Sequence, residues 1–193
     1  MIRKRVLVPL AEGFEEIEAV TIIDILRRAG ADVTTAGLGK RNVMGSHAIP
    51  MITDSVIEEE KIKSWDMIVL PGGLPGATNL ADNENILELI RGLSKKGKIV
   101  AAICASPVAL ERAGVLSGKK VTSHPTSSKD ILSGDYRETR VMKDGNIITG
   151  QACGSAMEFA FELVAALFGS KKVGEINQSI LSNLLNENKE SEN

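Results

Sequence analysis

Cys104 stands at the point in the chain best suited to a nucleophile. The apolar run 99–103 has the composition of a buried strand, and Pro107 suits the first turn of a helix that begins just after the cysteine. At such a strand-to-helix turn the backbone N–H groups of the helix face the side chain, and their partial positive charge favours a thiolate. We therefore expect a reactive Cys104 thiol with a lowered pKa. The alternative is a buried cysteine that packs as a small hydrophobic residue.

Glu18 is the second candidate, in a helix expected from about Glu15 to Ala29. A helical phase of ~100° per residue places Glu18 on one stripe with Ile22, whereas Glu16 falls close to Arg27 on nearly the opposite side. Because burial of a carboxyl group is costly and raises its pKa, a protonated Glu18 would hydrogen-bond the thiolate or move a substrate proton. Acidic residues in a first turn stabilise any helix, so a purely structural role is the alternative.

Backbone and imidazole groups are expected to complete a site around the thiol. Gly72 and Gly73 follow the buried strand 67–70 and, with Ala105, expose N–H groups that could hold an oxyanion. His124 precedes a proline that keeps its backbone extended, so its ring can point into the same crevice. A plain glycine turn and a structural histidine are the alternatives.

Strand-like and helix-like segments alternate along the chain. We expect strands at 6–10, 32–36, 67–70, 99–103 and 120–122, a hairpin over 140–143 and 146–149, an irregular extended segment over 43–52, and further helices at 83–95, just after Cys104, at 155–168 and at 171–185. This alternation predicts an α/β fold, with a mostly parallel sheet and helices on both faces. In such sheets the site lies at the carboxyl ends of the strands, where 11–15, 71–73, Cys104 and 123–125 would converge.

The composition fits one domain and argues against several classes of partner. With 193 residues, 43% of them hydrophobic, we expect a single domain over 1–185 and a disordered polar tail over 186–193. A net charge of −2 and 3% aromatic residues give no basis for nucleic-acid binding. No apolar segment reaches the ~20 residues of a membrane span and no disulfide framework is recognisable, so we expect a cytoplasmic protein without a membrane partner.

No metal or cofactor is expected from the sequence. The two histidines and two cysteines lack the short paired spacing of zinc sites, and no glycine-rich nucleotide motif or phosphate-loop lysine occurs. His47 lies in the irregular segment 43–52, where a surface or interface position is expected.

Together these residues resemble the ThiJ/PfpI superfamily, in particular its parkinsonism-linked DJ-one branch and the bacterial relatives of that branch. The resemblance extends to about Phe168 and rests on an ordered set of segments: 15–18 (EEIE), 27–30 (RRAG), 69–73 (VLPGG), 101–105 (AAICA), 121–125 (VTSHP) and 158–160 (EFA). It implies a flavodoxin-like three-layer sandwich and a homodimer. It also implies a role for each matching residue: Cys104 as oxidisable nucleophile, Glu18 as its partner carboxylate, His124 as pocket histidine, Gly73 and Ala105 as backbone donors, and Arg28 as a side chain that reaches the other subunit's pocket.

Three positions depart from the usual pattern of the branch. His47 stands where arginine is usual, which weakens an anion-binding role there. Cys153 replaces the proline of a Gly-Pro-Gly loop and brings a second thiol toward the pocket, as a packing substitute or as a resolving thiol. Ala105 stands where the protease branch has histidine, so peptidase activity is not expected.

The resemblance implies a cofactor-free enzyme whose substrate is a small reactive dicarbonyl. Through a Cys104 hemithioacetal it would convert methylglyoxal to lactate without glutathione, or remove early glycation adducts as a protein deglycase. The alternative is an oxidative-stress sensor or chaperone that is switched by oxidation of Cys104.

Overall fold

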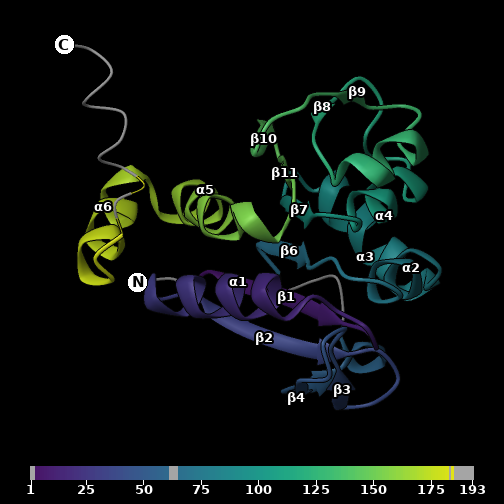
Figure 1. Ribbon diagram of the computed structural model, residues 1–193, viewed down its shortest axis with the longest axis horizontal. Coiled ribbons are helices and arrows are strands. Elements are labelled where there is room, and N and C mark those ends of the chain that lie inside the picture. The colour runs from purple at the N-terminus through teal and green to yellow at the C-terminus, as the bar shows by residue number, and fades with distance from the viewer. Residues whose placement is uncertain (1–2, 61–64, 183, 185–193) are drawn as a thin grey trace.

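A seven-stranded sheet runs through the centre of the molecule (Figure 1). The structure is a computed structural model that describes residues 3–60, 65–182 and 184. Across the sheet the strands are, in order, β10 (Val141–Asp144), β11 (Ile147–Gly150), β7 (Ile99–Ile103), β6 (Met67–Leu70), β1 (Arg5–Leu10), β2 (Asp32–Gly37) and β5 (Ser55–Val56). All neighbouring strands are parallel except β10, which pairs antiparallel with β11.

Helices cover both faces of this sheet. On one face lie α1 (Glu16–Arg28), α5 (Ala156–Phe168) and α6 (Ser170–Ser179); on the other lie α2 (Gly76–Ala81), α3 (Glu84–Lys95) and α4 (Pro107–Arg112) (Figure 1). Because side chains alternate along a strand, β1 serves both layers: Val6 and Val8 pack in the first hydrophobic core, and Leu7 in the second. The predicted α/β architecture, a flavodoxin-like three-layer sandwich, is confirmed.

Several short elements lie outside the central sheet. They are the antiparallel pair β3 (Asn42–Met44) and β4 (Pro50–Ile52), the parallel pair β8 (Lys120–Val121) and β9 (Asp135–Tyr136), and the 3₁₀ turns η1 (Ile57–Glu59), η3 (Pro125–Asp130) and η4 (Cys153–Ser155). The segment 43–52 is therefore a hairpin and not the irregular stretch that we expected. Its connecting loop carries His47, and Phe14 forms an isolated bridge with Gly45 that ties the loop to the start of α1.

The helices differ from expectation at two places. One short helix, α2, follows the Pro71-Gly72-Gly73 turn where no helix was expected. The last helix ends at Ser179 and not at 185, since Leu181 adopts a positive φ of 55° that a helix cannot continue. The tail expected over 186–193 lies outside the described residues. Among the helices of the described residues, none has both the length and the apolar character needed to cross a membrane.

Candidate functional site

Cys104 lies on the sharp turn between β7 and α4, in a backbone conformation that few non-glycine residues adopt. Its φ is 64°, in the left-handed region that is sterically unfavourable for a side chain bearing a Cβ. Two hydrogen bonds hold it there: the Cys104 N–H donates to the Gly150 carbonyl at 3.0 Å, and the His124 N–H donates to the Cys104 carbonyl at 2.8 Å. The expected strand-to-helix turn is confirmed, and the thiol it presents is free and half-buried.

Glu18 is fully buried, at 0% exposure, in the first turn of α1. Its Oε2 accepts a 2.7 Å hydrogen bond from the Gly72 N–H, whereas its buried Oε1 has no partner among the described residues. Burial raises the pKa of the Glu18 carboxyl to about 7, against the lowering effect of the Gly72 N–H and the Cys104 thiol. The predicted buried carboxyl with a raised pKa is confirmed.

Gly72 brings the carboxyl and the thiol together. A Cβ at this position would lie 2.6 Å from the Cys104 Cβ and 2.9 Å from Glu18 Oε2, so no side chain fits. Its N–H is bonded to Glu18, and Gly72 is therefore not the free oxyanion donor that we expected. The N–H groups of Gly73 and Ala105 do face the Cys104 sulfur, and they lower the pKa of the thiol.

The pKa of Cys104 is nevertheless raised. Burial and then the Glu18 carboxylate raise it to about 12, which outweighs the two N–H groups. The lowered pKa of Cys104 that we expected from the sequence is wrong. The prediction took account of the helix N–H groups but not of a buried negative charge beside the sulfur. Two adjoining buried groups do not both carry negative charge, so Glu18 and Cys104 lose the first of their two protons near pH 7 and share the second one above that pH. A thiolate forms when that proton lies on Glu18.

The structure places the other three expected residues as follows. His124 is half-buried beside the Cys104 carbonyl, and its ring Nδ1 lies 2.8 Å from Thr126 Oγ1 on its own loop. Cys153 is exposed and lies three residues after Gly150, whose carbonyl accepts the Cys104 N–H. Arg28 is exposed near the end of α1, where its Nε donates to Asp24 Oδ2 at 2.6 Å. Within one chain, Arg28 is therefore paired with its own helix.

A cavity of about 590 Å³ opens beside the turn. Its wall includes Ala105 next to the thiol, Leu74 after the Gly72-Gly73 turn, and Thr126 on the His124 loop. Most of the lining comes from α2, α4 and η3, and neither Cys104 nor Glu18 is part of it, so the cavity adjoins the thiol at Ala105 and does not enclose it.

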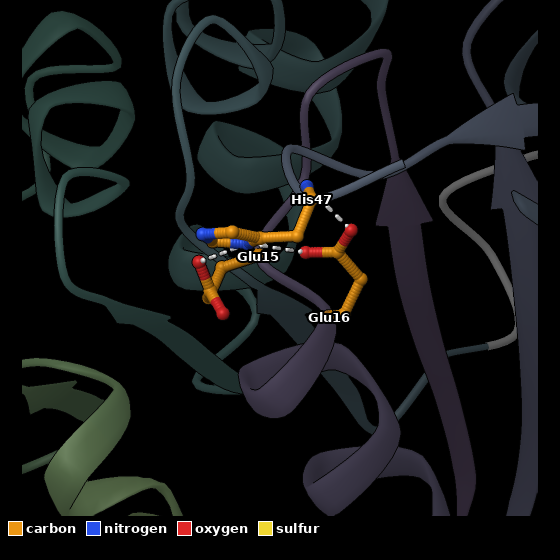
Figure 2. Close-up of side chains that lie close together, drawn as sticks. All are labelled: Glu15, Glu16 and His47. Atoms are coloured by element: carbon orange, nitrogen blue, oxygen red, sulfur yellow. Dashed lines mark hydrogen bonds and ion pairs between the residues drawn. The ribbon is translucent and has the colours of Figure 1, made fainter. Parts of the chain in front are cut away.

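Glu16 has a different environment from the one predicted. It is buried, with 6% exposure, because the loop of the β3–β4 hairpin covers it. The helical phase used for the prediction describes only the position of a residue on its own helix, so it could not account for this loop. Its Oε1 accepts the His47 N–H at 2.7 Å, and its Oε2 lies 3.0 Å from His47 Nδ1 (Figure 2). Burial raises the pKa of Glu16, but the hydrogen bonds from His47 and Ile49 outweigh it and lower the pKa to about 2.

His47 and Glu15 complete a second cluster that the sequence did not reveal. The His47 side chain is 70% exposed, as the expected surface position requires, and its Nδ1 also lies 3.6 Å from Glu15 Oε2 (Figure 2). The hydrogen bond to Glu16 raises the pKa of the His47 imidazole. Glu15 joins this cluster to the first site, since its N–H donates to the Gly72 carbonyl at 2.9 Å.

The sequence is similar to those of several known proteins. The model of the DJ-1/PfpI family matches residues 4–166. The Parkinson disease protein 7 homolog of Danio rerio is 40% identical over 94% of this chain and 98% of its own length. The glutathione-independent glyoxalase DJR-1.2 of Caenorhabditis elegans is 33% identical, over 86% of this chain and 89% of its own.

Two further comparisons concern length and fold. Protein DJ-1 homolog A of Arabidopsis thaliana is 41% identical over 92% of this chain, which spans only 46% of that longer protein. The crystal structure of Drosophila melanogaster DJ-1beta superposes with a TM-score of 0.90 at 37% identity, covering 93% of this chain and 98% of the other.

Proposed function

Since the chain belongs to the DJ-1/PfpI family, we propose that it is a cofactor-free enzyme that converts methylglyoxal and similar dicarbonyls to hydroxy acids without glutathione. The observation that carries the proposal is the Glu18 carboxyl. It is fully buried, its pKa is raised, and one of its oxygens accepts no hydrogen bond from the described residues, beside a thiol on a strained turn. A buried oxygen without a partner costs free energy, which a group that exchanges protons during a reaction would justify. The glyoxalase named among its relatives supports the same activity.

Attack on the aldehyde is the first step of the proposed reaction. Glu18 takes the thiol proton, the Cys104 sulfur forms a bond to the aldehyde carbon, and the π electrons of the carbonyl move to its oxygen. The Gly73 and Ala105 N–H groups, which face the sulfur, stabilise the developing oxyanion. The proton then passes from Glu18 to this oxygen, which gives a hemithioacetal and a Glu18 carboxylate.

Proton transfer between two carbons is the second step. Glu18 removes the hydrogen of the former aldehyde carbon as a proton, which leaves an enediolate. The hydroxyl proton on that carbon passes to the neighbouring oxygen, and Glu18 returns its proton to the neighbouring carbon as the C–S carbon becomes a carbonyl. The product is a thioester of lactic acid, whose carbon–sulfur bond water hydrolyses to release lactate and the thiol. One carbon is oxidised and its neighbour reduced, so the reaction needs no external oxidant or reductant.

The cavity beside Ala105 sets the size of substrate that the proposal allows. A volume of about 590 Å³ exceeds the needs of a three-carbon dicarbonyl. Removal of early glycation adducts, in which the carbonyl carbon is attached to a larger molecule, uses the same hemithioacetal and fits the same opening. His124, on the loop that borders this cavity, would orient the carbonyl group.

A role as a redox sensor is the second candidate, and one feature favours it. The half-buried Cys104 sulfur faces two N–H donors, which would also bind the oxygens of a sulfinate formed when peroxide oxidises the thiol and is itself reduced to water. A protonated Glu18 would donate a hydrogen bond to the sulfinate. The two free thiols suit a reducing compartment such as the cytoplasm.

A homodimer formed through α1 is part of the proposal. Ile17 and Val20 are 58% and 51% exposed on this helix, which is unusual for large apolar side chains in one turn. Arg28 lies exposed on the same helix, where it would extend to the pocket of the second copy.

Lactate formation by the purified protein tests the proposal directly. We expect lactate from methylglyoxal in the absence of glutathione, and no lactate from Cys104→Ala. Cys153→Ala is the matched control, since it removes the other thiol at an exposed position. An unmodified protein that consumes no methylglyoxal, but whose Cys104 is oxidised selectively by peroxide, would favour the sensor instead.

A further inference from the structure

Four electronegative side-chain atoms meet at the start of α1, outside the Cys104 site. They are Glu15 Oε2, Glu16 Oε2, Ser46 Oγ and His47 Nδ1. Ser46 Oγ lies 3.3 Å from the Glu15 oxygen, 3.1 Å from the Glu16 oxygen and 3.0 Å from Nδ1. Nδ1 lies 3.0 Å and 3.6 Å from the Glu16 and Glu15 oxygens (Figure 2). The side chains of two segments, 31 residues apart in sequence, thus converge on one point.

The cluster holds too few protons for its close contacts. Ser46 Oγ has one hydrogen to donate and His47 Nδ1 at most one, while both carboxylate oxygens only accept. Ser46 Oγ and His47 Nδ1 lie close to each other and to both carboxylate oxygens, so these five contacts share at most two hydrogens and some of them bring lone pair against lone pair. A positive ion at the centre would turn all four lone pairs into favourable interactions. From this shortage of protons, together with the mixed donor set, we propose that Glu15, Glu16 and His47, assisted by Ser46, bind a divalent cation of the zinc type.

The spacing of the donor atoms fits such an ion. In a tetrahedral site with metal–ligand bonds of about 2.0–2.2 Å, neighbouring ligand atoms lie about 3.3–3.6 Å apart. The separations that involve Ser46 Oγ or His47 Nδ1 span 3.0–3.6 Å, and the two carboxylate oxygens lie within 4.8 Å of each other. Binding therefore requires only a small adjustment of these side chains. On binding, Nδ1 offers its lone pair to the ion and its proton goes to water.

Glu16 is already held in the orientation that the site requires. The N–H groups of His47 and Ile49 bind its Oε1 at 2.7 Å and 3.4 Å, which leaves Oε2 turned toward the other donors. Gly45 permits this approach, because a Cβ there would lie 2.2 Å from Oε1. A carboxylate fixed through its second oxygen is a preorganised metal ligand.

The donor types select the kind of ion. One imidazole nitrogen with carboxylate oxygens suits Zn²⁺ and neighbouring transition metals, whereas Mg²⁺ and Ca²⁺ prefer oxygen ligands alone. With the imidazole neutral, the two carboxylates give the site a charge complementary to a divalent cation. The His47 side chain is 70% exposed, so the ion can enter from solvent and keep a water ligand. Once bound, it would pin the β3–β4 loop to the start of α1.

Zinc binding measured on the whole chain at neutral pH tests this site. Because Cys104 and Cys153 are also possible zinc ligands, the reference is the Cys104→Ser/Cys153→Ser double variant. We expect calorimetry to give one Zn²⁺ per chain in this reference. His47→Gln or Glu15→Gln should weaken zinc binding at least about tenfold, because loss of a residue that only hydrogen-bonds a metal ligand already weakens binding by about that much. His124→Gln is the matched control, since it removes the other histidine and should leave zinc affinity unchanged.

Cobalt provides a second measurement that identifies the ligands. Co²⁺ bound to the double variant should show visible absorption bands, and these bands should be lost when His47→Gln is added to the double variant. Circular dichroism verifies that each variant is folded. The proposal is overturned if the double variant binds no zinc, if adding His47→Gln to it leaves zinc affinity unchanged, or if the cobalt bands persist after that substitution. None of these results bears on dicarbonyl turnover, which rests on Cys104.

Discussion

The Gly72 N–H donates to one oxygen of the Glu18 carboxyl at 2.7 Å and leaves the other oxygen without a partner within the described part of the chain. The hydrogen bond fixes the direction of the carboxyl group, and the vacant oxygen remains available to a proton. The loop after β6 therefore orients the group that shares a proton with Cys104, although it contributes no titratable side chain of its own.

Replacement of Glu18 by glutamine should change how stability depends on pH. The pKa of Glu18 is raised from 4.5 to about 7 in the folded chain, so its stabilising effect is complete below pH 4.5 and is lost as the pH rises through 7. The side chain in Glu18→Gln does not titrate. As the pH rises across this range, the free energy of unfolding of the parent should therefore fall by about 3 kcal/mol relative to that of the variant. Urea unfolding at several pH values measures it. Glu88→Gln, an exposed carboxyl on α3, is the control; parallel pH curves for parent and Glu18→Gln would contradict the prediction.

Alkylation of Cys104 should report the proton that it shares with Glu18. As the pH passes about 7 the pair retains one proton, which can lie on either group, so the alkylation rate should rise there. In Glu18→Gln no carboxylate accepts the thiol proton, and the inflection should move to higher pH. Mass spectrometry of labelled peptides follows Cys104, with the exposed Cys153 as an internal reference. An unchanged inflection in the variant would separate Glu18 from the thiol chemistry.

Glu16→Gln should weaken the fold and spare the chemistry. The Glu16 carboxylate accepts hydrogen bonds from His47 and Ile49, and loss of its charge should lower the free energy of unfolding by about 1–3 kcal/mol at neutral pH. Since its folded pKa is about 2, the stabilisation exists above pH 4.5 and disappears as the pH falls toward 2. Thermal unfolding and lactate assays of the folded variant measure the two effects. A folded variant with normal stability, or one whose turnover falls at least about tenfold, would be incompatible with this assignment.

Gly72→Ala should damage the site through sterics alone. The added methyl would lie 2.6 Å from the Cys104 Cβ and 2.9 Å from Glu18 Oε2, and such overpacking costs about 1–3 kcal/mol. We expect turnover to fall at least about tenfold, because displacement of either group disturbs proton transfer. In Gly174→Ala the methyl meets nothing within 4 Å, and this control should retain full activity. Normal turnover by a folded Gly72→Ala would show that the close approach is not needed.

The proposed dimer should depend on the exposed apolar side chains of α1. Light scattering at micromolar concentration should give about twice the 20.6 kDa mass of one chain, because the family resemblance implies a homodimer. Ile17→Glu should shift the protein to monomer, since a buried unpaired charge at an interface is strongly unfavourable. Ile52→Glu changes an apolar residue that is even more exposed, at 78%, and should leave the dimer intact. A monomeric parent chain would exclude the arrangement.

The Cys104 turn and the burial of Glu18 could be predicted because both depend on local pattern. An apolar strand that ends in a cysteine followed by a helix defines the turn, and the helical phase of α1 defines which carboxyl faces the sheet. The surroundings of Glu16 could not be predicted in this way. They depend on a hairpin loop about thirty residues further on, whose position follows from the Phe14–Gly45 bridge and from the space that Gly45 leaves.

The ionisation of Cys104 required the structure for a related reason. Helix amides beside a cysteine are visible in the sequence, but the opposing charge comes from a residue on another element. How the two effects balance depends on their relative positions in space, and here burial and Glu18 outweigh Gly73 and Ala105. The role of the Gly72 N–H also required the structure. The glycine pair in the sequence suggests a free donor, whereas in the fold this N–H donates to Glu18.

Leu7 and Val8 are neighbours in the chain, yet they pack on opposite sides of the sheet in separate cores. Substitutions that touch no common partner add independently in their effect on stability. The two halves of the molecule can therefore accumulate sequence changes without compensating for one another. The turn at Cys104 is fixed by backbone hydrogen bonds to Gly150 and His124, and such bonds survive the exchange of most side chains. Substitutions in either core should therefore leave the position of the Cys104 sulfur unchanged.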